Sequence, residues 1–151
     1  MQGLGARLQV SEASVGLQGP ALSIQSYRDL LVWQKAMRLA AEAYRLGRLL
    51  PKTEEYRLTS QLLRAAASVP ANIAEGHARG TRKDYAHFVS IARGSLAETE
   101  TIILLLVEVD LLTNGRVQQA LELCAETGRM LNGLLKRLRD NPEPKNLKPD
   151  P

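Results

Sequence analysis

The sequence predicts an all-α fold, an antiparallel up-down-up-down four-helix bundle with disordered N- and C-terminal tails. Apolar residues recur at helical spacing through four long stretches between residues 27 and 140. Pro51, Gly80 and the pair Asn114-Gly115 break these stretches, and such short connections make consecutive helices antiparallel. Aromatic residues make up only 4% of the 151 residues, so the core must consist mainly of Leu, Ala, Ile and Val, which suits helices.

Two tails flank the predicted bundle, which occupies residues 27–140. Residues 1–26 are rich in Gly, Ser, Gln and Ala and carry few charges, so we expect a flexible N-terminal tail. Residues 141–151 contain four prolines and cannot continue a helix, which predicts an extended, Pro-rich C-terminal tail.

The first predicted helix runs from about Arg28 to Leu50 and carries two apolar stripes that lie side by side. Together the stripes cover roughly half of the helix, which is more than a corner of a monomeric bundle needs. Contact with another subunit and deep burial in a tight bundle both stay open as explanations. One stripe is Leu30, Trp33, Met37, Ala40 and Tyr44, and the other is Val32, Ala36, Leu39, Ala43, Leu46 and Leu50.

The remaining helices follow from their start and stop signals. Thr53 is a plausible N-cap for the second, which runs to about Arg79 and which Pro70 should kink. Gly80 ends it, and Thr81 with Asp84 forms a variant capping box for a third helix to about Leu112. After a predicted turn at Asn114-Gly115, the fourth helix spans residues 116–139.

The sequence offers little catalytic chemistry. His77 and His87 flank the second turn, but no metal-binding motif is present, and two solvated histidines are the simpler explanation. Cys124, the only cysteine, lies on an apolar stripe, where a small buried side chain is expected. We therefore expect no enzyme, no catalytic residue, no metal site and no cofactor.

The location is also inferred from missing signals. A single cysteine cannot form an internal disulfide, and the first 26 residues contain no apolar run like that of a signal peptide. The aliphatic run from Ile102 to Val107 is far too short to cross a bilayer. These features favour a cytoplasmic protein with no membrane contact.

Two polar residues, Asn72 and Glu75, lie one turn apart just after Pro70. Buried polar groups must be paired, and Glu75 could pair with Arg79 or, across the bundle, with other arginines. A contact with a subunit or ligand is one explanation. We favour a structural polar network that satisfies the carbonyl freed by Pro70, made of Asn72, Glu75, Arg64 and Arg93.

Charge is unevenly distributed along the chain. The net charge of +4 is modest, but residues 94–128 carry six acidic side chains and one basic one, a net of −5. In an up-down bundle the second turn, the end of the fourth helix and the start of the first share one end. The basic residues expected there are Arg28, Arg79, Arg82, Lys83, Lys136, Arg137 and Arg139.

Helix dipoles explain part of this basic end, because cations are favourable at helix C-termini. Arg82 and Lys83 are different, since they open a helix, where positive charge is unfavourable. Their position favours a nucleic-acid-binding role through phosphate contacts.

Three stretches carry a likeness to a known family. They are Asp29-Leu-Leu-Val-Trp-Gln-Lys-Ala36, Gln61-Leu-Leu-Arg-Ala-Ala-Ala-Ser-Val-Pro-Ala-Asn-Ile-Ala-Glu-Gly76 and His87-Phe-Val-Ser-Ile-Ala-Arg-Gly-Ser-Leu-Ala-Glu-Thr-Glu100. By these residues the chain resembles the bacterial four-helix bundle proteins encoded within intervening sequences of 23S ribosomal RNA genes. It departs from that pattern at Leu63, where a basic residue is common, and at Arg57, where glycine is common.

The resemblance implies a four-helix bundle that assembles as a ring-shaped homopentamer. It also implies kinship with the accessory variability proteins of diversity-generating retroelements, which are basic pentameric bundles that work with a reverse transcriptase and nucleic acid. The family name records where the genes lie and describes no activity.

Three hypotheses follow. The leading one is a non-enzymatic homo-oligomer, pentameric by the resemblance, that binds nucleic acid through its basic end, with RNA favoured over DNA. The alternative is a protein-interaction scaffold or an accessory subunit of a reverse transcriptase or polymerase, in which the wide apolar faces matter most. An enzyme is a remote third, since the sequence holds no nucleophile–base pair.

Overall fold

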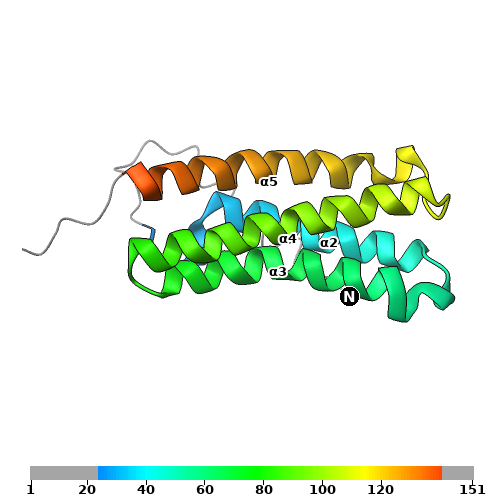
Figure 1. The fold of residues 1–151 in the computed structure, drawn as a ribbon, viewed down its shortest axis with the longest axis horizontal. Helices are drawn as coiled ribbons and strands as arrows, with labels where there is room; N and C mark the ends of the chain where they lie inside the picture. The colour runs from blue at the N-terminus through cyan, green and yellow to red at the C-terminus, as the bar shows by residue number, and fades with distance from the viewer. Residues whose placement is uncertain (1–23, 141–151) are drawn as a thin grey trace, which may run out of the picture.

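Residues 24–140 are described by the computed structural model, and they contain four α-helices and no strand (Figure 1). The helices are α2 (Leu31–Leu49), α3 (Ser60–Ala78), α4 (Arg82–Glu108) and α5 (Asn114–Asp140). A short 3-10 helix, η2 (Tyr27–Asp29), precedes α2. The two predicted tails fall outside the described residues, except for residues 24–26.

The four helices form one bundle in which each runs antiparallel to the next (Figure 1). Helix α2 packs on α3 and α5, and α4 packs on the same two helices, so α2 and α4 lie diagonally across the bundle. The prediction of an all-α up-down-up-down four-helix bundle is confirmed. None of the helices within residues 24–140 is long and apolar enough to cross a membrane.

The core is built from the apolar faces of all four helices. Leu39, Leu62, Ile103 and Leu131 are fully buried, one from each helix. On α2 the stripe from Val32 to Leu50 faces this core, as burial in a tight bundle requires. The other stripe is only partly covered, because Trp33 and Met37 are half-buried and Tyr44 is exposed. That stripe therefore offers surface for a contact outside the core.

The connection between α2 and α3 differs from the prediction. A 3-10 helix, η3 (Lys52–Glu54), and a turn of π-helix, η4 (Glu55–Thr59), precede α3. The N-cap predicted at Thr53 is therefore wrong, since this residue lies inside η3. Arg57 has non-helical backbone angles, φ −112° and ψ −114°, so no continuous α-helix runs through it, and α3 begins at Ser60.

The α3–α4 and α4–α5 connections each contain one residue with a positive φ. Gly80 has φ +85°, the left-handed conformation that commonly ends a helix, as predicted. The turn predicted at Asn114-Gly115 is wrong, because α5 already begins at Asn114. The chain reverses before that, where Asp110 has φ 61°, a conformation that aspartate tolerates better than most residues.

Candidate nucleic-acid interface

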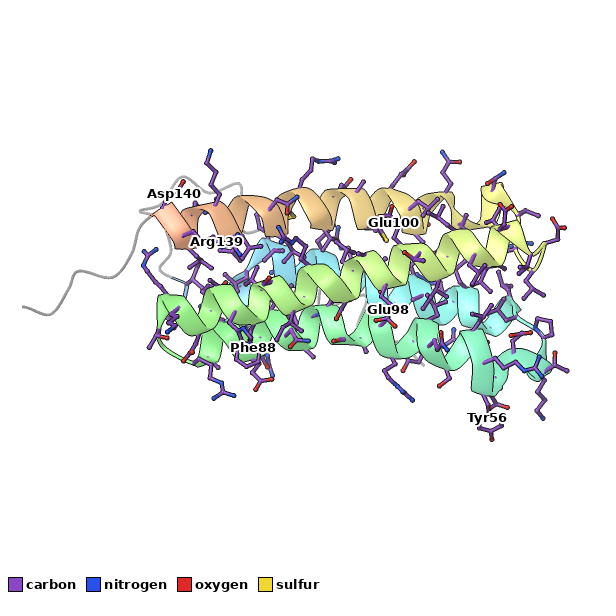
Figure 2. The ribbon with its side chains drawn as sticks, in the orientation of Figure 1. Tyr56, Phe88, Glu98, Glu100, Arg139 and Asp140 are labelled. Carbon is purple, nitrogen blue, oxygen red and sulfur yellow. The ribbon has the colours of Figure 1, made fainter. Side chains whose placement is uncertain are left out.

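One end of the bundle collects four segments that are far apart in the sequence. Helix η2 with the start of α2, the end of α3, the start of α4 and the end of α5 all lie there (Figure 1). We call this the basic end, and its predicted binding residues are Arg28, Arg79, Arg82, Lys83, Lys136, Arg137 and Arg139. Figure 2 shows Arg139 at this end and Tyr56 at the opposite one.

Local hydrogen bonds fix where the chain enters the basic end. The Ser26 hydroxyl accepts from the backbone N–H of Arg28 at 3.2 Å, and Asp29 Oδ2 accepts from the backbone N–H of Ser26 at 3.2 Å. This reciprocal capping box orients η2. The Arg28 carbonyl then accepts from Gln34 Nε2 at 2.8 Å, which ties η2 to α2.

A second cap fixes the turn between α3 and α4. The Thr81 hydroxyl accepts from the backbone N–H of Asp84 at 3.1 Å, so Thr81 is the N-cap of α4, as predicted. Because the helix starts at this point, Arg82 and Lys83 lie in its first turn with exposed side chains.

The seven basic residues are all exposed, but Arg79 is already engaged within the protein. Its Nη2 lies 3.0 Å from Glu75 Oε1, and its guanidinium carbon lies 5.0 Å from the centre of the Phe88 ring. Asp29, Asp84 and Asp140 also lie at this end. The basic end therefore carries more basic than acidic side chains, and Glu75 partly neutralises the charge of Arg79.

A shallow groove opens between α5 and the segment formed by η2 and the start of α2. It has a volume of about 630 Å³ and an apolar floor that includes Leu31, Met130 and Leu134. Arg129 and Arg137 lie on its border. The groove was not predicted from the sequence, because it depends on how η2 sits against α5. Its one sequence signal is the pair Arg129 and Arg137. These residues are eight apart, so their side chains lie within about 80° of each other around the last helix.

Tyr85 lies beneath the basic end, packed edge-on against His77 with 5.6 Å between ring centres. Its hydroxyl is buried and has no hydrogen-bond partner among residues 24–140. Burial raises the pKa of Tyr85 above its usual value, and the positive charge of Arg137 partly opposes that rise. Tyr85 therefore supports the turn between α3 and α4 as an apolar ring.

The four residues predicted to form a polar network do not come together. Asn72 Nδ2 donates to the hydroxyl and the carbonyl of Ser68, both at 2.8 Å, while Glu75 pairs with Arg79. Arg93 Nη1 reaches Asn132 of α5 at 3.3 Å, and Arg64 is exposed. The network is therefore a wrong prediction: Asn72 serves Ser68 rather than Ala66, whose carbonyl Pro70 leaves without its usual donor.

The polar contact between α3 and α4 is made by serines instead. Ser95 of α4 donates its hydroxyl proton to Ser68 of α3 at 3.0 Å. Asn72 completes this short chain from within α3. Sequence periodicity placed Ser68 on the helix, but it could not show that Ser95 would face it.

The remaining reactive side chains play packing or surface roles. Cys124 is buried in the core, and burial, with a smaller effect from Glu100, raises the pKa of its thiol to about 12. A thiol in that state is not a nucleophile at neutral pH. Within residues 24–140, no cluster of three or more His, Cys, Asp or Glu side chains could hold a metal ion.

Comparison with known proteins agrees with this fold. A crystal structure from Bacteroides thetaiotaomicron VPI-5482, of a protein with unknown function from the S23 ribosomal protein family, matches with a TM-score of 0.66. That protein is 25% identical to this chain, and the match covers 70% of this chain and 99% of the other. A search of the curated proteins found no match.

A family model describes most of the bundle. The model of the 23S rRNA-intervening sequence protein matches residues 28–133, which include α2, α3, α4 and most of α5. The matched region contains the three stretches by which the sequence resembles that family. The family description names no enzymatic activity, and the related crystal structure is of a protein with unknown function. The chain belongs to the 23S rRNA-intervening sequence protein family.

Proposed function

We propose that this protein is a non-enzymatic, self-associating bundle of the cytoplasm that binds nucleic acid through its basic end. The observation that carries the proposal is the gathering of seven exposed basic residues from separate segments at one end of the bundle. Both RNA and DNA offer the phosphates that such residues contact, and RNA is the favoured ligand of this proposal. A pentameric ring is the favoured assembly, by the family resemblance.

Binding would depend little on the nucleotide sequence of the ligand. Exposed Lys and Arg side chains contact phosphates, and phosphate contacts supply affinity without reading bases. Lys83 and Lys136 suit a test of this role, because both are exposed and they come from different helices, α4 and α5. A ring of parallel subunits would place several copies of the basic end on one side and add their contacts together.

Charge reversal at the basic end tests the proposal. Lys83→Glu combined with Lys136→Glu should weaken binding of a structured RNA by at least about tenfold at low salt, since phosphate contacts become repulsive. The matched control is Lys52→Glu with Arg116→Glu, which makes the same change in net charge at the opposite end. Fluorescence anisotropy of a labelled RNA hairpin measures the affinity of both double variants. Equal affinity in the two variants would contradict the proposal.

A protein-interaction role is the second candidate, and the exposed apolar side chains of α2 and α4 favour it. It would make the bundle an accessory subunit of a nucleic-acid polymerase or reverse transcriptase. Capture experiments after nuclease treatment separate the two roles. A single protein recovered at fixed stoichiometry favours the second role, whereas loss of all bound material on nuclease treatment favours the first.

A further inference from the structure

Within residues 24–140, only two of the four α-helices carry large hydrophobic side chains that are exposed. Among the described residues, the large exposed hydrophobics within these helices are Leu31, Tyr44 and Leu49 of α2 and Ile91, Leu104 and Leu105 of α4. Their side chains are 40–61% exposed. Val109, 49% exposed, directly follows α4, while α3 and α5 carry none. Two helices of a monomer would thus leave apolar surface in water while the other two do not.

These two surfaces cannot cover each other within one molecule. Helix α2 and helix α4 each pack on α3 and α5, so they occupy opposite corners of the bundle. Their exposed faces point away from the shared core. Each face needs a partner outside the chain.

In the halves of α2 and α4 that lie away from the basic end, the charges beside the two apolar surfaces have opposite sign. On α2, the basic side chains of Arg45 and Arg48 are exposed, and its one acidic residue, Glu42, is buried against Arg45 at 2.8 Å. From Gly94 to its end, α4 has no basic residue and exposes Glu98, Glu100 and Glu108. Figure 2 shows Glu98 and Glu100 on the part of α4 nearer Tyr56 than Arg139.

We infer that the α2 face of one copy of this chain packs on the α4 face of another. The first face is Leu31, Tyr44, Arg45, Arg48 and Leu49, and the second is Ile91, Glu98, Leu104, Leu105 and Glu108. The inference rests on the proposed self-association and assigns the surfaces that carry it. Opposite charges attract across an α2–α4 contact, whereas α2–α2 and α4–α4 contacts would bring like charges together.

The directions of the two helices fit a parallel arrangement of copies. Within one chain α2 and α4 run the same way and finish at the same end of the bundle (Figure 1). Arg48 lies in the last turn of α2, and Glu108 lies in the last turn of α4. Copies placed side by side in parallel would therefore bring Arg48 level with Glu108. The same arrangement places every basic end on one side of the assembly.

A contact between two different faces is heterologous, so each copy offers both halves of it. Such contacts build a closed ring or an open filament, whereas a two-fold dimer uses the same face twice. The contact is therefore testable by blocking one half at a time. Two full-length variants serve this purpose: Tyr44→Glu blocks the α2 face and Leu105→Arg blocks the α4 face. Both residues are exposed, so the fold should survive, which circular dichroism checks.

The experiment measures solution mass by light scattering after nuclease treatment. The wild-type chain should assemble, and each variant alone should dissociate with a dissociation constant raised at least about tenfold. Mixed in equal amounts, the two variants should assemble at least into a 1:1 heterodimer. The intact α4 face of the Tyr44→Glu chain then meets the intact α2 face of the Leu105→Arg chain.

Three outcomes would overturn the inference, and they differ in what else they contradict. If the wild type assembles and both variants assemble equally well, the faces are wrong but self-association stands. If the variants dissociate and the mixture stays monomeric, the contact is not between α2 and α4. If the wild type is itself monomeric, the self-association in the proposed function fails as well, and the faces are left for a different protein.

Discussion

Gly76 in α3 and Phe88 in α4 are so close that a Cβ on Gly76 would lie 2.7 Å from the Phe88 Cβ. The same Cβ would also lie 3.2 Å from the carbonyl oxygen of Tyr85. Neither obstacle is the flexible end of a side chain, so the helices would have to separate. Glycine at this position sets the distance between α3 and α4 where the basic end begins.

Gly76→Ala should therefore destabilise the protein by about 1–3 kcal/mol, the usual cost of overpacking a tight contact. Gly133→Ala is the matched control, because a Cβ there meets nothing within 4 Å. It should be neutral or stabilise the protein by up to about 1 kcal/mol, since alanine favours a helix. Urea unfolding followed by circular dichroism measures both free energies. Equal effects of the two substitutions would show that the close approach has no energetic weight.

The N-cap of α4 at Thr81 gives a second prediction. Thr81→Ala removes the hydroxyl that accepts from Asp84 N–H and should cost about 0.5–2 kcal/mol of unfolding free energy. Thr53→Ala removes the same atoms from an exposed residue of η3 that makes no capping hydrogen bond. Its effect should stay within about 0.5 kcal/mol. A larger loss at Thr53 than at Thr81 would contradict the observed start of each helix.

Alkaline pH should weaken the fold through Cys124. Because burial raises the pKa of this thiol from 9.0 to about 12, the folded chain holds its proton between those values while the unfolded chain releases it. Stability therefore falls as pH rises above 9, by about 1–2 kcal/mol near pH 10. The raised pKa of Tyr85 acts in the same direction at higher pH.

Cys124→Ala isolates the contribution of the thiol. The variant should be less stable at pH 7, because it leaves a small cavity, but its unfolding free energy should decline less steeply between about pH 8 and 10.5. Urea unfolding at several pH values measures the slopes. Parallel curves for wild type and variant would mean that the thiol ionises as easily in the folded chain as in the unfolded one.

An ion pair between α2 and α5 gives a prediction at acidic pH. Lys35 Nζ lies 2.7 Å from Glu126 Oε2, and this hydrogen bond and the charge of Lys35 lower the pKa of the Glu126 carboxyl. The contribution of the pair to stability is present at neutral pH and is lost as pH falls through that lowered pKa. Lys35→Met should raise the pKa of Glu126 towards the ordinary glutamate value, whereas Lys52→Met should not. Carbon-detected NMR titration of the glutamate carboxyls follows the change, and an unmoved Glu126 would refute the pair in solution.

The sequence was sufficient to predict the four helices and which of their ends lie together. Periodic apolar residues and the stop at Gly80 define the number and direction of the helices, because short connections permit only antiparallel neighbours. Thr81 was identifiable as a cap from its spacing to Asp84. The Ser26–Asp29 cap follows the same spacing rule, so the sequence contained its signal as well.

The wrong predictions concern rotation and local backbone choice. Periodicity shows that Arg93 is on the surface of a helix, but its contact with Asn132 depends on how α4 is rotated towards α5. The late start of α3 depends on the non-helical backbone at Arg57, which helix propensity alone does not anticipate. At Asn114-Gly115 a frequent turn pair begins a helix instead, because Asp110 already reverses the chain.

The salt dependence of RNA binding tests the central claim most directly. For the wild type, the logarithm of the binding constant should fall linearly with the logarithm of salt concentration, because bound phosphates release counterions. Removing two phosphate contacts, as in Lys83→Glu with Lys136→Glu, should flatten that slope by roughly 1.4–1.8, while Lys52→Glu with Arg116→Glu should leave it unchanged. A slope that is near zero in the wild type, or that both double variants share, would contradict a nucleic-acid-binding basic end.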